Sequence, residues 1–196
     1  CTEPIAVAYC AAKLREVLGG KPEEVLAEVS GNILKNVKSV VVPNTDGRRG
    51  IDAAIAVGIV AGDADAELQV IANVTEDDAA AIQGYLDATP IKVTCPVTPC
   101  LLDIFLHGKR AGHTAAVRVA NNHTNIIYME RDGEVLLEKP LTANAEDNLQ
   151  DKSVLNVKDI ITFAETVPLD RIEPVIGRQI ACNLALIHIS EPTRLR

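Results

Sequence analysis

The first residue of the sequence is a cysteine that directly precedes a predicted helix. Cys1 is followed by Thr2, which suits a helix N-cap, and by Glu3 and Pro4 in the first turn. Unpaired N–H groups and the positive end of the helix dipole favour the thiolate form of a cysteine at such a position. Cys1 is therefore a candidate metal ligand or nucleophile, and the alternative is a structural cysteine at an arbitrary position.

Two histidine–threonine pairs suggest acid–base chemistry. His113-Thr114 and His123-Thr124 stand at the outer ends of a predicted hairpin, and each is followed by a strand pattern. If both pairs converge on one pocket, an imidazole can accept a proton while the hydroxyls bind a carboxylate. The alternative is that neighbouring backbone groups satisfy both histidines.

The stretch Ser30-Gly31-Asn32 marks the end of a predicted strand and the start of a short helix. Free N–H groups at a helix start can hold an anion, and Gly31 would let a ligand approach closely. Ordinary capping is the competing explanation. The other cysteines are less informative, because Cys95 and Cys100 fit a stiff proline-rich turn better than a metal site, and Cys10 lies inside an apolar helix.

An α+β pattern must position these residues. Apolar periodicity predicts an antiparallel sheet flanked by helices, with a loop over 41–50 that can wrap a ligand and a hairpin turn at Asp132-Gly133. The predicted helices are a first one that ends at Leu18, a short one from Asn32, and others over 51–61, 64–74, 75–87, 154–167 and 170–183. The predicted strands are 24–30, 91–95, 101–108, 113–120, 124–131 and 134–139.

Composition narrows the possible partners and the compartment. The 196 residues carry a net charge of -8 without a basic run, which argues against nucleic acid and anionic membrane surfaces as partners. Aromatic residues make up 3% of the chain, so few side chains could stack on nucleic-acid bases. Five irregularly spaced cysteines favour a reducing compartment, and without a transmembrane pattern we expect a cytoplasmic protein.

A series of motifs resembles one enzyme family. The stretches CTEPIAVA, VSGNILKN, VVPNTDG, GIDAAIA, AGHTAAV, HTNI and QIACN occur in the order seen in the front half of L-cysteine desulfidases, also called the UPF0597 or serine dehydratase-like alpha family. The resemblance covers residues 1–185 as the N-terminal part of one such domain, cut off before a C-terminal helical half. Residues 186–196 resemble a non-native tail, and we leave them out of the fold prediction.

The resemblance implies a reaction and a cofactor. An oxygen-sensitive [4Fe-4S] cluster, with Cys1 as one ligand and the others outside this chain, would support α,β-elimination of L-cysteine or L-serine without pyridoxal phosphate. The products would be pyruvate, ammonia, and sulfide or water. His113 and His123 are the candidates for the base. The candidate contacts for the substrate's carboxylate or amino group are Asn32, Thr124 and Asn125.

Two other functions compete with the lyase. One is a non-catalytic small-molecule binding domain of the same fold, and the other is a thiol hydrolase built on Cys1 and His113, which lacks an orienting third residue. The loop PNTDGRRG departs from the glycine-rich loop expected of the family, so Arg48 and Arg49 could alter substrate preference. The exposed edge of an incomplete domain would also favour aggregation or a homo-oligomer.

Overall fold

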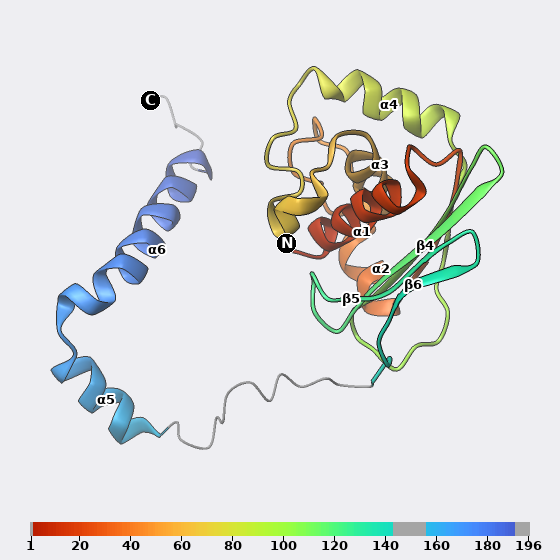
Figure 1. Cartoon of the computed structure of the whole chain (residues 1–196). Helices are drawn as coiled ribbons and strands as arrows, with labels where there is room; N and C mark the ends of the chain where they lie inside the picture. The colour runs from red at the N-terminus through yellow and green to blue at the C-terminus, as the bar shows by residue number, and fades with distance from the viewer. Residues whose placement is uncertain (1, 143–155, 191–196) are drawn as a thin grey trace, which may run out of the picture. The chain divides into compact units, whose positions relative to one another are not determined.

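The computed structural model describes residues 2–142 and 156–190 (Figure 1). The chain divides into two compact units, residues 1–146 and 147–196. The elements of the first unit are α1 (Glu3–Leu18), β1 (Glu24–Val29), α2 (Gly31–Val37), α3 (Gly50–Ala61), the 3-10 helix η1 (Ala64–Gln69), α4 (Asp78–Ala88), β2 (Ile91–Thr94), β3 (Asp103–Arg110), β4 (His113–Ala120), β5 (Ile126–Arg131) and β6 (Glu134–Glu138). The predicted α+β class is confirmed.

The six strands form one sheet in the order β2-β1-β3-β4-β5-β6. All neighbours are antiparallel except β1 and β2, which run parallel. The chain between β1 and β2 carries α2, α3, η1 and α4, because parallel neighbours require a long crossover. Two hairpins have tight turns in which both central residues have positive φ, at Ala111-Gly112 and at the predicted Asp132-Gly133.

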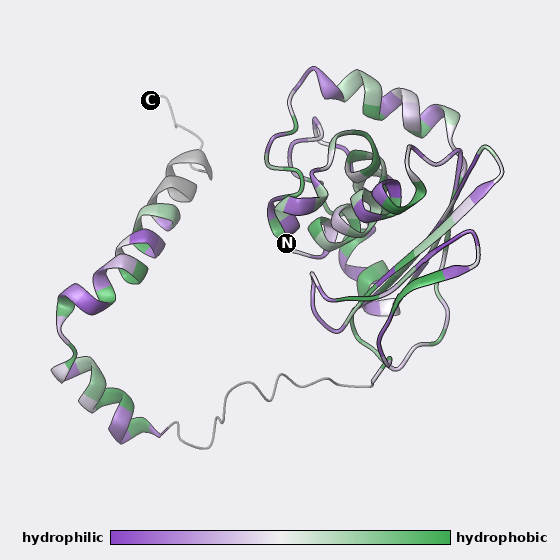
Figure 2. Cartoon of the chain, in the orientation of Figure 1, coloured by the Kyte–Doolittle hydropathy of each residue, from purple (hydrophilic) through white to green (hydrophobic). Residues whose placement is uncertain are grey.

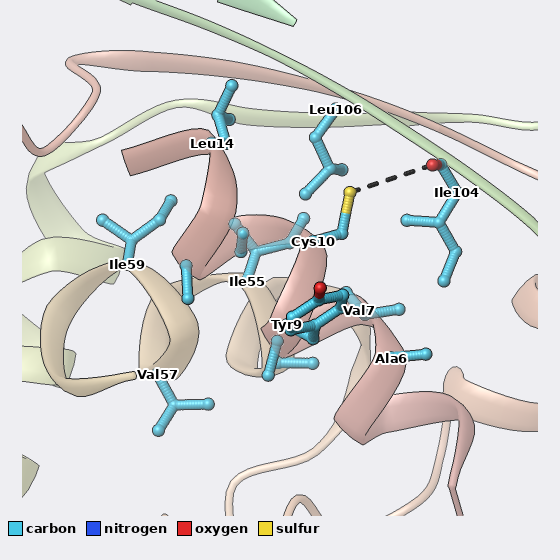
Figure 3. Packing of buried hydrophobic residues seen from close by; sticks show 14 of the residues in the cluster. Ala6, Val7, Tyr9, Cys10, Leu14, Ile55, Val57, Ile59, Ile104 and Leu106 are labelled. Carbon is cyan, nitrogen blue, oxygen red and sulfur yellow. Dashed lines mark hydrogen bonds between the residues drawn. The ribbon is translucent and has the colours of Figure 1, made fainter. Parts of the chain in front are cut away.

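Helix α1 is the centre of the core, packed between the sheet and α3 (Figure 3). Residues Ala6 to Ala12 are all buried, so this helix is apolar around its whole circumference. Small side chains allow close packing against α3, where a Cβ added to Gly58 would lie 2.2 Å from the carbonyl oxygen of Ala8. Arg15 strengthens the contact by donating hydrogen bonds to the carbonyls of Ile59 and Gly62 at 3.0 and 2.7 Å.

Several local predictions were wrong, each for an identifiable reason. Thr2 has helical backbone angles and makes no side-chain cap bond. The predicted helix 64–74 is a 3-10 helix over 64–69, interrupted at Glu67, whose φ is 47°. The predicted helix 75–87 begins at Asp78, and the Asp78 carboxylate accepts hydrogen bonds from the N–H and hydroxyl of Thr75 at 2.9 and 3.0 Å. The strand predicted over 24–30 is confirmed as β1, which is one residue shorter because Ser30 caps α2.

The second unit contains helices α5 (Val157–Thr166) and α6 (Leu169–Ser190). Asn156 caps α5 by accepting a hydrogen bond from the N–H of Asp159 at 2.9 Å. Hydrophobic residues of α5 remain exposed in this unit, among them Ile160, Ile161 and Phe163 (Figure 2). Helix α6 continues through residues 186–190 of the stretch that we set aside as a tail. Within the described ranges, no helix combines the length and hydropathy that a bilayer crossing requires.

Candidate functional site

Most of the predicted site residues lie at one end of the sheet, where β1, β2 and β4 finish and β3 and β5 begin. Because β1 and β2 run parallel and β3 runs opposite to them, the ends of β1 and β2 lie beside the start of β3. The end of β4 and the start of β5 lie at this same edge, since Asp103 pairs with Ala120 and Val119 pairs with Ile126. We call this the loop edge, formed by residues 30–32, 95–103 and 121–125. It contains Asn32, His123, Thr124 and Asn125.

Ser30 shapes the part of the loop edge that carries Asn32. Its side-chain oxygen accepts a hydrogen bond from the N–H of Ile33 at 3.4 Å and donates one to the carbonyl of Leu101 at 2.6 Å. The helix start is therefore capped by its own serine, as the simpler of our two interpretations predicted. Asn32 is exposed, and its side-chain oxygen accepts a hydrogen bond from Asn36 at 3.5 Å.

His123 lies in the connection between β4 and β5 and is only partly exposed. Its Nε2 is buried and has no hydrogen-bond partner within the described residues. Buried polar atoms in proteins are nearly always paired, so an unpaired imidazole nitrogen at a loop edge requires an explanation. A bound substrate or an exchanged proton would provide one.

The two residues after His123 have different roles in the connection. The Asn125 side chain donates a hydrogen bond to the carbonyl of Ala120 at 2.9 Å, and the backbone N–H of Ala120 donates to the carbonyl of Asn125 at 3.1 Å. Asn125 therefore closes the connection onto the end of β4. Thr124 is partly exposed, and its carbonyl accepts a hydrogen bond from the N–H of Ile126.

His113 lies far from this edge. His113 is the first residue of β4 and His123 follows its last, so the two histidines flank a strand of eight residues, about 25 Å at 3.3 Å per residue. The expectation that the two His-Thr pairs converge on one pocket is therefore wrong, because both flank the same strand. His113 Nδ1 instead lies 2.8 Å from Asp132 Oδ2, and Asp132 Oδ1 accepts a hydrogen bond from the N–H of Thr114 at 2.8 Å.

Cys1 lies outside the described residues. The residues that follow it bring the start of α1 close to α2, since the Glu3 carboxylate accepts a hydrogen bond from the Asn36 side chain at 3.3 Å. Helix α2 begins at Gly31, on the loop edge. Helix α1 therefore begins close to the part of α2 that carries Asn32 and Asn36.

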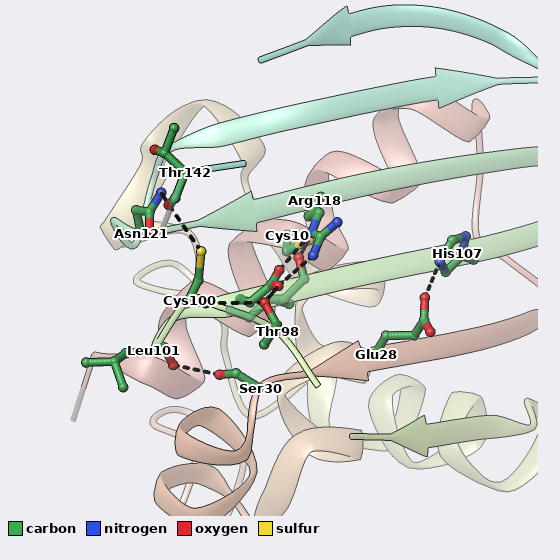
Figure 4. Close-up of polar contacts among 12 residues, drawn as sticks. Cys10, Glu28, Ser30, Thr98, Cys100, Leu101, His107, Arg118, Asn121 and Thr142 are labelled. Carbon is green, nitrogen blue, oxygen red and sulfur yellow. Dashed lines mark hydrogen bonds and ion pairs between the residues drawn. The ribbon is translucent and has the colours of Figure 1, made fainter. Parts of the chain in front are cut away.

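The described cysteines do not form a cluster site. Cys10 lies in the core, where burial raises the pKa of its thiol. Its Sγ donates to the carbonyl of Val117 and to that of Ile104, the second contact being drawn in Figure 3. Cys100 is buried and its Sγ donates to the carbonyl of Thr142 at 3.5 Å (Figure 4). Within the described residues, no group of three or more potential ligands could hold a metal ion. These residues alone therefore do not fit an iron–sulfur cluster.

Cys95, which the sequence analysis assigned to a stiff proline-rich turn, also lies at the loop edge. It is exposed, directly after β2, and its Sγ lies 3.9 Å from the position that a Cβ on Gly31 would take. Its proximity to Gly31 depends on the parallel pairing of β1 with β2, for which the sequence contains no local signal.

The two arginines of the loop over 41–50 have structural partners. Arg48 donates to the side chain of Gln83 and to the carbonyls of Thr45 and Ala79, at 3.1, 2.6 and 3.2 Å. Arg49 donates to the carbonyl of Ser39 at 2.9 Å. Both guanidinium groups hold the loop in place, which provides an explanation for these residues other than substrate preference.

Comparison with known proteins gives consistent names. A protein of Treponema denticola is 45% identical over 185 residues, which is 94% of this chain and 43% of the relative. Proteins of Desulfitobacterium hafniense and Lachnoclostridium phytofermentans are 43% and 40% identical, over 95% and 93% of this chain and 43% and 44% of their own lengths. All three are UPF0597 proteins.

The chain spans less than half the length of these UPF0597 relatives. The name itself states no activity. No family model matches the chain, and no solved structure matches it significantly. The similarity therefore agrees with the UPF0597 part of the resemblance read from the motifs.

Proposed function

We propose that this chain contributes part of the active site of a lyase that eliminates sulfide from L-cysteine, or water from L-serine. The loop edge is the part of the chain that serves this reaction. The observation that carries the proposal is the buried, unpaired Nε2 of His123 at that edge. The ordered motif series and the similarity to UPF0597 proteins support the choice of reaction.

His123 is the proposed proton-transfer group. In the elimination, a base removes the Cα proton, the electron pair forms the Cα–Cβ double bond, and the bond from Cβ to sulfur or oxygen breaks. The resulting aminoacrylate becomes an imine, which water hydrolyses to pyruvate and ammonia. An imidazole whose Nε2 is buried and unpaired suits the first step, whereas His113 is already paired with Asp132.

Asn32 and Thr124 are the proposed contacts for the substrate's carboxylate and amino group. Both are accessible, and a side-chain amide can donate to a carboxylate while its oxygen accepts from an ammonium group. Asn125 has a supporting role, because its amide already holds the end of β4. The distance between α2 and the connection over 121–125 then determines which amino acids fit.

The proposal includes a [4Fe-4S] cluster with Cys1 as one ligand and the remaining ligands outside this chain. When bound, such a cluster supplies an open iron that acts as a Lewis acid on the β-substituent. The resemblance is the support for the cluster, and no step assigned here to His123, Asn32 or Thr124 depends on it.

The test is to measure sulfide and pyruvate release from L-cysteine by the protein extended to the length of its relatives. His123→Gln should lower kcat by about 10²–10⁴-fold, the usual contribution of a general base. His113→Gln is the matched control and should retain activity within about threefold. Equal losses in the two variants would contradict the assignment, and substrate binding without products would favour a binding domain.

A further inference from the structure

An ion pair between a buried carboxylate and a partly exposed guanidinium lies at the loop edge, beside the proposed site. The Asp103 carboxylate is 5% exposed, and it accepts hydrogen bonds from Arg118 Nε at 2.8 Å and Nη2 at 2.6 Å (Figure 4). The Thr98 hydroxyl donates to the same carboxylate. The Arg118 guanidinium also lies over the Phe105 ring, 5.1 Å from its centre. These contacts fix both the place and the rotation of the carboxylate.

The backbone beside Asp103 connects two separate parts of the loop edge. The carbonyl of Asp103 accepts a hydrogen bond from the N–H of Ser30 at 2.9 Å, and the carbonyl of Leu101 accepts one from the Ser30 hydroxyl at 2.6 Å. The carbonyl of Leu102 accepts a hydrogen bond from the N–H of Asn121 at 2.9 Å. Residues 101–103 therefore join the cap of α2, which precedes Asn32, to the connection that contains His123.

A buried ion pair is a poor source of stability, because apolar residues of the same size often serve as well. A two-pronged arginine–carboxylate contact does restrict geometry, since both nitrogens must meet both oxygens. Because Asp103 belongs to the segment 101–103, a contact that holds its carboxylate also restricts the backbone carbonyls of that segment.

We propose that Asp103 and Arg118 are positioning residues, which set the distance between Asn32 and His123 through the backbone of residues 101–103. This inference rests on the proposed function for its catalytic meaning. Its structural part depends only on the contacts of this chain.

The structural part is tested by amide hydrogen exchange on the whole 196-residue chain. Asp103→Asn should speed exchange at the Ser30 and Asn121 amides by at least about tenfold, while core amides of α3 keep their rates. Asp132→Asn is the control, because the Asp132 carboxylate pairs with His113 at 2.8 Å at the opposite end of β4. Unchanged rates at both amides, or an equal increase across the core, would overturn the proposal.

The catalytic part is tested by kinetics on the protein extended to the length of its relatives. Asp103→Asn and Arg118→Met should lower kcat about tenfold or more with KM changed by less than about threefold, as expected when groups are misplaced in the transition state. Arg118→Lys, which keeps the charge, should recover part of the rate. An equal change in kcat and KM would overturn the positioning role. If the unaltered protein does not turn over, the proposed function fails, and the exchange result still decides the structural part.

Discussion

At the scale of single residues, two histidines in the same sequence context have different surroundings. His123 has a buried nitrogen without a partner, whereas His113 is mostly exposed and lies 2.8 Å from Asp132. The N–H of Thr114 and then His113 hold the pKa of Asp132 below its ordinary value. His113 is thus explained by a local contact at a hairpin, while no contact among the described residues pairs the Nε2 of His123.

Replacing His113 tests this contact. Because the hydrogen bond from Thr114 remains, His113→Ala should raise the pKa of Asp132 only part of the way to its ordinary value. Because the pKa of Asp132 is lower in the folded than in the unfolded chain, its carboxylate stabilises the fold at pH values above the unfolded-state pKa. This stabilisation is lost as the pH falls through the folded-state pKa. NMR titration of the Asp132 carboxyl carbon measures the change. Asp78, held by Thr75, is the control, and an unmoved Asp132 titration would contradict the contact.

At the scale of elements, the fold depends on the close crossing of α1 and α3. A Cβ at Gly58 would lie 2.2 Å from the Ala8 carbonyl oxygen, so Gly58→Ala should force the helices apart and destabilise the chain by about 2–3 kcal/mol. Gly84→Ala in α4 is the control, because a Cβ there meets nothing within 4 Å, and it should be neutral or stabilising by up to about 1 kcal/mol. Urea unfolding measures both. An equal change in the free energy of unfolding of the two variants would contradict the close crossing of α1 and α3 as the cause of the destabilisation.

Elements with local signals were predictable, and long-range pairings were not. The turn at Asp132-Gly133 and the cap at Ser30 are encoded within a few residues. The parallel pairing of β1 with β2 joins segments more than 60 residues apart, and it alone brings Cys95 beside Gly31. The separation of His113 from His123 already follows from the predicted strand over 113–120, since one histidine begins that strand and the other follows its end.

At the scale of the whole molecule, the chain corresponds to less than half of its relatives. The loop edge contains the proposed proton-transfer group and the proposed substrate contacts, while the described cysteines supply no ligand set. A lyase site at the loop edge and the lack of a ligand set among the described cysteines are consistent under the proposal, in which the other ligands of the [4Fe-4S] cluster come from residues outside this chain. Cytoplasmic location and oligomeric state remain predictions from the sequence.

The most direct test of the lyase proposal is product release by the protein extended to the length of its relatives, reconstituted with iron and sulfide without oxygen. We predict equal amounts of sulfide and pyruvate from L-cysteine, together with the brown absorption of a cluster. Cys1→Ala should lose both the colour and the activity, and Cys182→Ala, at an exposed position, should retain them. A colourless protein that releases no products, or full activity in Cys1→Ala, would contradict the proposal.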